Sequence, residues 1–247
     1  MRLLKGLESR VRGLRRRASP LFWAGDAVHC PVCQRSFRGF RPAGKRQVRR
    51  ENAICPYCTA RERDRLAYLV LCGPNAPPAG SPILHIAPEA CLQPRLRELA
   101  AGDYVSADLV RTDVDQRFDV MAIPHADASF FGIYCSHVLQ DVPDDILAME
   151  ELFRILKPGG WAILNVPVTA EKSVDHPDRP GRRRQTLDSR PAEHLRTYGH
   201  DFEQRMASVG FEMHVTRSGD MVPPDDQARF GIAGPAAGAI FMGMKPS

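Results

Sequence analysis

The sequence has no run that approaches the roughly 18 consecutive apolar residues needed to cross a bilayer, and its longest apolar runs have the length of strands. An integral membrane protein is therefore not expected. The N-terminus is basic but has neither an apolar central region nor a small-residue cleavage site, so it does not have the pattern of a secretory signal. Together these two absences predict a cytoplasmic location.

The composition excludes two further classes. The hydrophobic share of 43% and the charged share of 26% are ordinary for a globular protein, so neither a long disordered chain nor a collagen-like chain is expected. No internal repeat is visible. The net charge of +5 is modest, but it is concentrated in two clusters, each of which is either a solvated surface or an anion contact. The first cluster consists of Arg10, Arg12, Arg15, Arg16 and Arg17, and the second consists of Arg182, Arg183 and Arg184.

Residues 1–21 are predicted to form a basic amphipathic helix. Apolar residues recur there at spacings near 3.6, and arginines fill the remaining face. Such a helix either docks on the rest of the protein or lies on an anionic membrane surface. The apolar residues are Leu3, Leu4, Leu7, Val11 and Leu14.

Residues 22–72 are predicted to form a zinc-binding module with a following helix. The segments Cys30-Pro-Val-Cys33 and Cys55-Pro-Tyr-Cys58 are two C-x-x-C knuckles with 21 residues between them. Each knuckle turns two sulfurs toward a shared tetrahedral centre. Four thiolates leave no open coordination position, so the metal is expected to be structural. The module has few apolar residues of its own, and a metal would supply the stability that packing cannot.

Two other uses of these cysteines remain open on the sequence alone. A pair of disulfides conflicts with the expected cytosolic location. A redox C-x-x-C lacks a thioredoxin-like strand before it. The other three cysteines lie on or beside apolar segments, where cysteine commonly acts as a small buried hydrophobe. They are Cys72, Cys91 and Cys135.

The Pro/Gly-rich stretch 73–80 predicts a domain boundary. From residue 81 to 247, short apolar runs alternate with helical periods, as in βαβ units of an α/β domain. Strands are expected at 83–87, 104–107, 118–121, 133–136 and 161–166, and a helix over 146–156 is expected to end before Lys157-Pro-Gly-Gly160. We also expect a helix near 192–209 and a closing pair of strands at 211–216 and 238–244.

Several segments of this domain resemble class I S-adenosylmethionine-dependent methyltransferases of the type 11 group. The resemblance covers about residues 81–168 and implies a Rossmann-like, seven-stranded, mostly parallel sheet with an antiparallel closing strand. It also implies S-adenosyl-L-methionine as cofactor. The segments are Tyr104-Val-Ser-Ala-Asp108-Leu109, Phe118-Asp-Val120, Asp127-Ala-Ser-Phe130, Cys135-Ser-His-Val-Leu139 and Glu151-Leu-Phe-Arg-Ile-Leu-Lys-Pro-Gly-Gly160.

The resemblance also implies cofactor-binding residues. Asp108, with Leu109 after it, stands where a carboxylate holds the ribose hydroxyls. Asp119 and Val120 stand at the adenine contact. Ser136 lies at the end of the fourth strand, which faces the methyl group.

The first turn departs from this group. Leu84-His-Ile-Ala-Pro-Glu89 stands where those enzymes usually carry an acidic residue and a G-x-G. The turn resembles that of a subset of zinc-knuckle, methyltransferase-like bacterial proteins with a His-x-Ala-Pro-Glu stretch. This predicts a variant turn in which Ala87 lies beside the cofactor, Glu89 binds its ammonium group, and His85 takes over the polar role of the acid.

His137 is the first candidate for a general base, because methyl transfer to a hydroxyl needs its proton removed near the transition state. Asp141, one helical turn later, is either its orienting partner or an alternative base. Titratable groups also concentrate at 194–202, where we expect an acceptor-binding cover without assigning individual roles.

Three functions follow from these patterns. The first is an S-adenosylmethionine-dependent methyltransferase acting on a small-molecule or glycan acceptor. The second is an RNA methyltransferase whose zinc module and basic helix bind the phosphate backbone; no aromatic stacking stripe supports it. The third is a non-catalytic binding protein that keeps the fold.

Overall fold

The computed structural model describes residues 22–44, 49–74, 76–178 and 194–247. The predicted N-terminal helix and the cluster of Arg182 to Arg184 lie outside these residues. The described chain forms two compact units. The first contains the described residues up to 74 together with 217–237, and the second contains the described residues between 75 and 216 together with 238–247. The boundary expected at 73–80 stays a prediction, and the structure adds that the chain returns to the first unit near its end.

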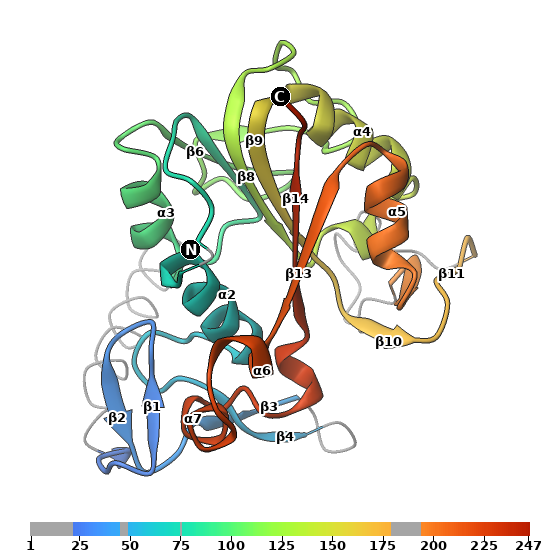
Figure 1. Ribbon diagram of the computed structural model, residues 1–247. Coiled ribbons are helices and arrows are strands. Elements are labelled where there is room, and N and C mark those ends of the chain that lie inside the picture. The colour runs from blue at the N-terminus through green and yellow to red at the C-terminus, as the bar shows by residue number, and fades with distance from the viewer. Residues whose placement is uncertain (1–21, 45–48, 75, 179–193) are drawn as a thin grey trace, which may run out of the picture. The chain divides into compact units, whose positions relative to one another are not determined.

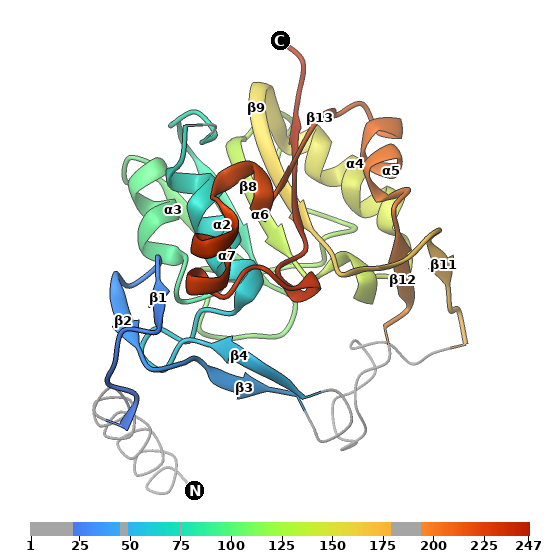
Figure 2. The same ribbon diagram turned by 60° about the horizontal axis from the view of Figure 1, so that its bottom comes forward.

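The first unit consists of two antiparallel hairpins and several helices (Figure 2). One hairpin pairs Cys30 with Arg35, and the other pairs Arg41 with Ile54. Its elements are β1 (Val28–Cys30), β2 (Arg35–Phe37), β3 (Arg41–Ala43), β4 (Arg50–Ile54), α2 (Glu62–Cys72), α6 (Ser218–Met221), α7 (Pro224–Phe230) and the 3-10 turn η3 (Pro235–Ala237).

The second unit is built on a seven-stranded sheet with the order β13-β14-β9-β8-β5-β6-β7. Strands β7, β6, β5, β8 and β9 are parallel, whereas β14 is antiparallel to β9. This confirms the mostly parallel sheet with an antiparallel closing strand. The strands are β5 (Ile83–Ile86), β6 (Tyr104–Asp108), β7 (Gln116–Arg117), β8 (Phe130–Ser136), β9 (Leu156–Asn165), β13 (Glu212–Arg217) and β14 (Ala239–Met244).

Helices cover both faces of this sheet. α3 (Gln93–Leu99) lies on one face, and α4 (Asp145–Ile155) and α5 (Phe202–Ser208) lie on the other (Figure 1). The main core fills the face toward α4 and α5, where Met149, Leu152 and Phe202 pack with strand residues such as Leu84 and Ile133. α4 ends at Ile155, two residues before Lys157, as expected, and the Lys-Pro-Gly-Gly stretch lies within β9.

The strand expected at 118–121 is wrong. The sheet edge is instead the two-residue strand β7, and the following residues make only an isolated bridge between Asp119 and Ala122. The apolar side chains of this run pack into the core from a turn: Val120 and Ile123 are both buried in the core. Apolar content alone therefore did not distinguish a strand from a core-packing loop.

The long helix expected near 192–209 is also wrong over its described part. Strand β12 (Arg196–Gly199) comes first, and only α5 is helical. β12 is the middle strand of a small sheet with β10 (Val168–Ala170) and β11 (Val174–Asp175). A Cβ atom at Gly199 would overlap the backbone of Lys172, so this close approach requires glycine.

No helix among the described residues is long and apolar enough to cross a membrane.

Candidate functional site

The two C-x-x-C knuckles adopt the same turn. Cys30 ends β1 and Cys55 follows β4, and each carbonyl accepts a hydrogen bond from the amide four residues later. These bonds are Gln34 N to Cys30 O at 2.9 Å and Thr59 N to Cys55 O at 3.2 Å. Gln34 and Thr59 both have positive φ, at 55° and 67°. Each turn directs its two sulfurs to the same side.

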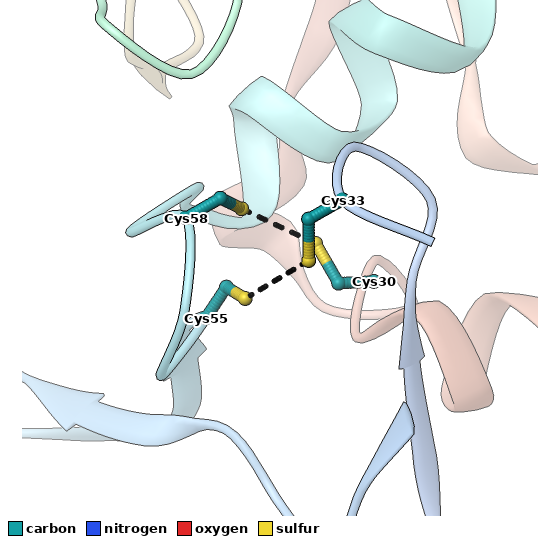
Figure 3. A group of neighbouring side chains, drawn as sticks. All are labelled: Cys30, Cys33, Cys55 and Cys58. Atoms are coloured by element: carbon teal, nitrogen blue, oxygen red, sulfur yellow. Dashed lines mark hydrogen bonds between the residues drawn. The ribbon is translucent and has the colours of Figure 1, made fainter. Parts of the chain in front are cut away.

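The four sulfurs converge on one point in the first unit (Figure 3). Cys30 Sγ lies 3.6 Å from Cys58 Sγ, and Cys33 Sγ lies 3.7 Å from Cys55 Sγ. All four sulfurs lie within 4.8 Å of one another. A tetrahedron with Zn–S bonds of about 2.3 Å has edges of about 3.8 Å. The cluster therefore has the size and the ligand chemistry of a four-thiolate zinc site.

A fully buried arginine from α2 lies beside this cluster. Arg65 donates to the carbonyls of Ala53 and Ala60 at 3.0 Å, and to that of Gly231 at 2.9 Å. Its guanidinium lies 4.0 Å from the ring centroid of Phe40. Burial lowers the pKa of Arg65, and the charge of Cys30 is the largest influence in the opposite direction. The arginine thus places a positive charge near the four sulfurs.

The second unit contains a cavity of about 460 Å³ at the carboxyl ends of β5, β6 and β8. This volume is within the range of about 300–1,000 Å³ found for small-molecule sites. In the sheet order β5 lies between β6 and β8, so the strands that follow β5 are added first on one side and then on the other. Open α/β sheets bind ligands at such a switch point. Seven predicted residues line the cavity: Ala87, Asp108, Leu109, Asp119, Val120, His137 and Asp141.

Two cavity residues have left-handed backbone conformations. Ala87 has φ of 50°, and His137 has φ of 57°. Such conformations are costly for residues other than glycine and persist where surrounding contacts hold them, commonly at functional sites. The amide of Ala87 donates to Ala107 O at 2.8 Å, and that of His137 donates to Asn165 O at 2.7 Å. Neighbouring strands therefore fix both turns.

The three remaining predicted cofactor residues are His85, Glu89 and Ser136. His85 is fully buried, and its Nε2 is 2.9 Å from Glu89 Oε2. Ser136 is also buried, and its hydroxyl makes no hydrogen bond within the described part of the chain. None of these three residues lines the cavity.

Asp108 shapes the loop that follows β6. Its Oδ1 accepts from Val110 N at 2.8 Å and from Arg111 N at 2.9 Å. Arg111 Nη1 in turn donates to Pro88 O at 2.8 Å. The loops that follow β5 and β6 are thereby joined at the mouth of the cavity.

Asp141 is held by a residue that is distant in the sequence. Its Oδ1 lies 2.8 Å from His194 Nδ1, and its Oδ2 accepts from Gln140 Nε2 at 3.3 Å. The sequence placed His194 in the segment 194–202, where an acceptor-binding cover was expected, but it gave His194 no individual role. Since 53 positions separate the two side chains, no local pattern could have paired them.

A buried ion cluster holds this segment in place. Asp145 accepts from Tyr198 Oη at 2.8 Å and from Arg205 Nη2 at 2.6 Å, and it lies 3.2 Å from Arg196 Nη1. Burial, followed by the charge of Asp145, raises the pKa of Tyr198. The cluster ties β12 and α5 to the start of α4, and so brings His194 to Asp141.

Comparisons with known proteins agree with this sheet. Residues 54–215, more than half of the chain, match a family model described as "Methyltransferase domain". A search of curated proteins gave no match. Among solved structures, a chain of the complex between the Haloferax volcanii Trm112 methyltransferase activator and the methyltransferase is 15% identical. The match covers 74% of this chain and 89% of that one, with a TM-score of 0.46.

Two further structures are similar to the same degree. An S-adenosylmethionine-dependent methyltransferase from Mesorhizobium loti is 19% identical over 72% of this chain and 94% of its own, with a TM-score of 0.46. A Burkholderia thailandensis 1,6-didemethyltoxoflavin-N1-methyltransferase is 15% identical. The match covers 69% of this chain and 72% of that one, with a TM-score of 0.39. The family model covers more than half of the chain, and the sheet has the strand order described above. On those two grounds, the chain belongs to the class I S-adenosylmethionine-dependent methyltransferases.

Proposed function

We propose that the cavity binds S-adenosyl-L-methionine and that the protein methylates a small-molecule or glycan acceptor. The observation that carries the proposal is the meeting of Asp108, Asp119 and His137 at the switch point of the sheet. Asp108 would hold the ribose hydroxyls, since Oδ1 serves two backbone amides and Oδ2 has no donor among the described residues. Asp119 and Val120 would flank the adenine.

The cofactor, when bound, supplies an electrophilic methyl group on a sulfonium. The protein's part is to position the acceptor and to accept its proton. His137 and Asp141 line the same cavity, and Asp141 also contacts His194. A hydroxyl acceptor fits this arrangement, because it loses a proton as it attacks and these side chains can receive one.

Isothermal titration calorimetry tests the cofactor assignment. Wild-type protein is expected to bind S-adenosylmethionine and S-adenosylhomocysteine, and not NAD, which also binds at switch points of α/β sheets. Absence of heat and of thermal stabilisation at millimolar S-adenosylmethionine would contradict both cofactor binding and catalysis. The acceptor class is then tested with methyl-labelled cofactor and cell extract, by comparing label in the glycan and small-molecule fractions with label in RNA.

An RNA acceptor is a second candidate, and one feature of the first unit favours it. Tyr57 is 39% exposed on the second knuckle, and the Arg35 guanidinium lies 3.9 Å from its ring centroid. Arginine and exposed aromatic rings are the side chains on which unpaired bases stack. RNA binding that weakens steeply with salt, and that Arg35→Ala reduces but Arg229→Ala does not, would favour this candidate.

We also infer that the four cysteines hold a structural zinc ion. The sulfur separations of 3.6 and 3.7 Å match the edge of a zinc–thiolate tetrahedron. Elemental analysis is expected to find zinc in equimolar amount, and Cys58→Ser is expected to lose it. Cobalt substitution gives a second readout, because tetrahedral thiolate ligation produces charge-transfer and visible absorption bands. Purified protein that holds no metal after refolding with zinc would contradict the assignment.

A further inference from the structure

Asp141 and Asp108 line the same cavity from different strands. Asp108 ends β6, whereas Asp141 belongs to the 3-10 turn η1 (Leu139–Asp141), which follows β8. In the sheet order β5 separates β6 from β8. A cofactor whose ribose is held by Asp108, and whose adenine is flanked by the loop that follows β7, therefore leaves the β8 end of the cavity for the methyl acceptor.

The carboxylate of Asp141 is held from both of its oxygens. His194 Nδ1 lies 2.8 Å from Oδ1, and Gln140 Nε2 donates to Oδ2 at 3.3 Å. The same amide nitrogen donates to His137 O at 2.6 Å, which ties Asp141 to the backbone of the other polar residue at this end of the cavity. A carboxylate oxygen can accept two hydrogen bonds, so these donors fix the orientation of the group without exhausting its capacity.

His194 is anchored to the same stretch of chain as Asp141. Two residues after His194, Arg196 Nη1 lies 3.2 Å from Asp145 Oδ1, and Arg196 Nη2 donates to Pro143 O at 3.4 Å. The His194 side chain is 41% exposed, whereas that of Asp141 is 9% exposed. The pair therefore runs from the surface to the cavity wall, and His194 can influence a ligand in the cavity only through Asp141.

We propose that Asp141 receives the proton of the acceptor hydroxyl and that His194 is the positioning residue for this carboxylate. The inference rests on the proposed methyl transfer. In that reaction the acceptor oxygen bonds to the methyl carbon, the bond from that carbon to sulfur breaks with its electron pair going to sulfur, and the hydroxyl proton passes to Asp141. The proton is released to solvent when the products leave. His194 keeps the receiving oxygen in place, which matters because small displacements of a catalytic group are costly in rate.

Two substitutions of His194 separate its hydrogen bond from its ring. His194→Asn places an amide nitrogen near the position of Nδ1 and keeps a donor for Asp141, whereas His194→Phe keeps a ring and loses the donor. The measurement is the initial rate at which label passes from methyl-labelled S-adenosylmethionine, at saturating concentration, to the small molecules and glycans of a cell extract. The rate is expected to fall by about tenfold or more in the Phe variant and by less than about threefold in the Asn variant.

Asp141→Asn replaces the proton acceptor by a neutral amide of the same shape. General-base catalysis contributes about 10²–10⁴-fold, so the same rate is expected to fall by about a hundredfold or more. The calorimetric affinity for S-adenosylhomocysteine should change by less than about twofold in this variant and in both His194 variants, which also shows that each is folded. His214→Phe, at an exposed histidine of β13, is the matched control and should change neither rate nor affinity.

His137→Asn tests the competing base at the same end of the cavity. Asparagine tolerates the left-handed backbone that His137 adopts, with φ of 57°, so the turn after β8 should be kept. The loss of rate is expected to be smaller than in Asp141→Asn.

The outcomes also separate this inference from the proposed function. If the wild-type protein transfers no label, the proposed function fails, and the inference with it. If the wild type transfers label but Asp141→Asn keeps its rate, or loses S-adenosylhomocysteine, the function stands and the assignment of Asp141 is overturned. A larger loss in His137→Asn than in Asp141→Asn would make His137 the base. Equal rates in the Asn and Phe variants of His194 would overturn the positioning role alone.

Discussion

Asp108 illustrates how one side chain serves both the loop and the ligand. Its Oδ1 closes the turn after β6 through two backbone amides, and it also lines the cavity. An asparagine at this position can keep the carbonyl oxygen that the amides need but loses the negative charge. The two roles can therefore be separated by a single substitution.

Asp108→Asn is expected to weaken S-adenosylhomocysteine and 5′-methylthioadenosine by similar factors of about tenfold, because both ligands contain the ribose and a charge-assisted hydrogen bond contributes about 1.5–3 kcal/mol. Calorimetry on both ligands checks this, with the thermal unfolding midpoint as the control for folding. Unchanged affinity for both would show that Asp108 does not hold the ribose.

Arg65 is a buried charge whose hydrogen bonds go to backbone carbonyls. Arg65→Met is expected to destabilise the first unit by about 3 kcal/mol or more, because several carbonyls then lose their donor inside the protein. Arg65→Lys should recover only part of the lost stability, because one ammonium group cannot reach all of these carbonyls. Denaturant unfolding followed at Trp23, which belongs to this unit, measures the change; a loss below about 1 kcal/mol would contradict it.

At this scale the sequence predicted which residues gather. The spacing of the paired cysteines predicted the cluster of four sulfurs, and the place of Asp108 at the end of a strand predicted a position at the cavity. His194 could not be predicted, because its contact with Asp141 depends on where β12 lies. His85 was identified, but its place behind Glu89 follows from the reversal at Ala87, for which the sequence offers no glycine as a signal.

At the scale of elements, the β12 segment depends on Asp145. This carboxylate is 1% exposed and joins Tyr198, Arg196 and Arg205 to the first turn of α4. The sequence predicted a helix here because its apolar residues suit a helical period. The buried ion cluster and the close approach at Gly199 favour a strand instead, and neither involves neighbours in the sequence.

Asp145→Ala is expected to destabilise the second unit by about 3–5 kcal/mol, because the buried Arg196 then keeps only the exposed Asp175 as an acidic partner among the described residues, and Tyr198 and Arg205 lose their acceptor. The exposed Glu150→Ala on the same helix is the control and should cost less than about 0.5 kcal/mol. Hydrogen exchange should show β12 and α5 opening first in the Asp145 variant. Exchange that rises uniformly over the unit would contradict a local role.

For the whole molecule, stability at high pH depends in part on buried phenols, among them Tyr104 and Tyr198. Burial is the main cause that raises the pKa of both Tyr104 and Tyr198 above the ordinary value of 10.0. The unfolded chain releases these protons above pH 10, whereas the folded chain retains them. Their contribution to stability is therefore intact below pH 10 and is lost progressively as the pH rises above it.

Unfolding midpoints measured from pH 9 to pH 11 are expected to fall beyond about pH 10. The double variant Tyr104→Phe, Tyr198→Phe should show a shallower fall, although it begins from a lower stability. Absorbance of phenolate in the native protein supplies an independent check. A slope that the double variant does not change would show that other groups control the alkaline limit.

The return of residues 217–237 to the first unit affects how the protein can be made. The four clustered cysteines are synthesised well before Gly231, which accepts from Arg65, and before the buried Ile232. Since domains tend to fold as they leave the ribosome, the second unit can assemble its parallel strands while the first still lacks part of its packing. The nascent cysteines are thus exposed to metal, and to oxidants, while the residues between them and Gly231 are translated, and the supply of metal during synthesis would then influence how many chains reach the folded state.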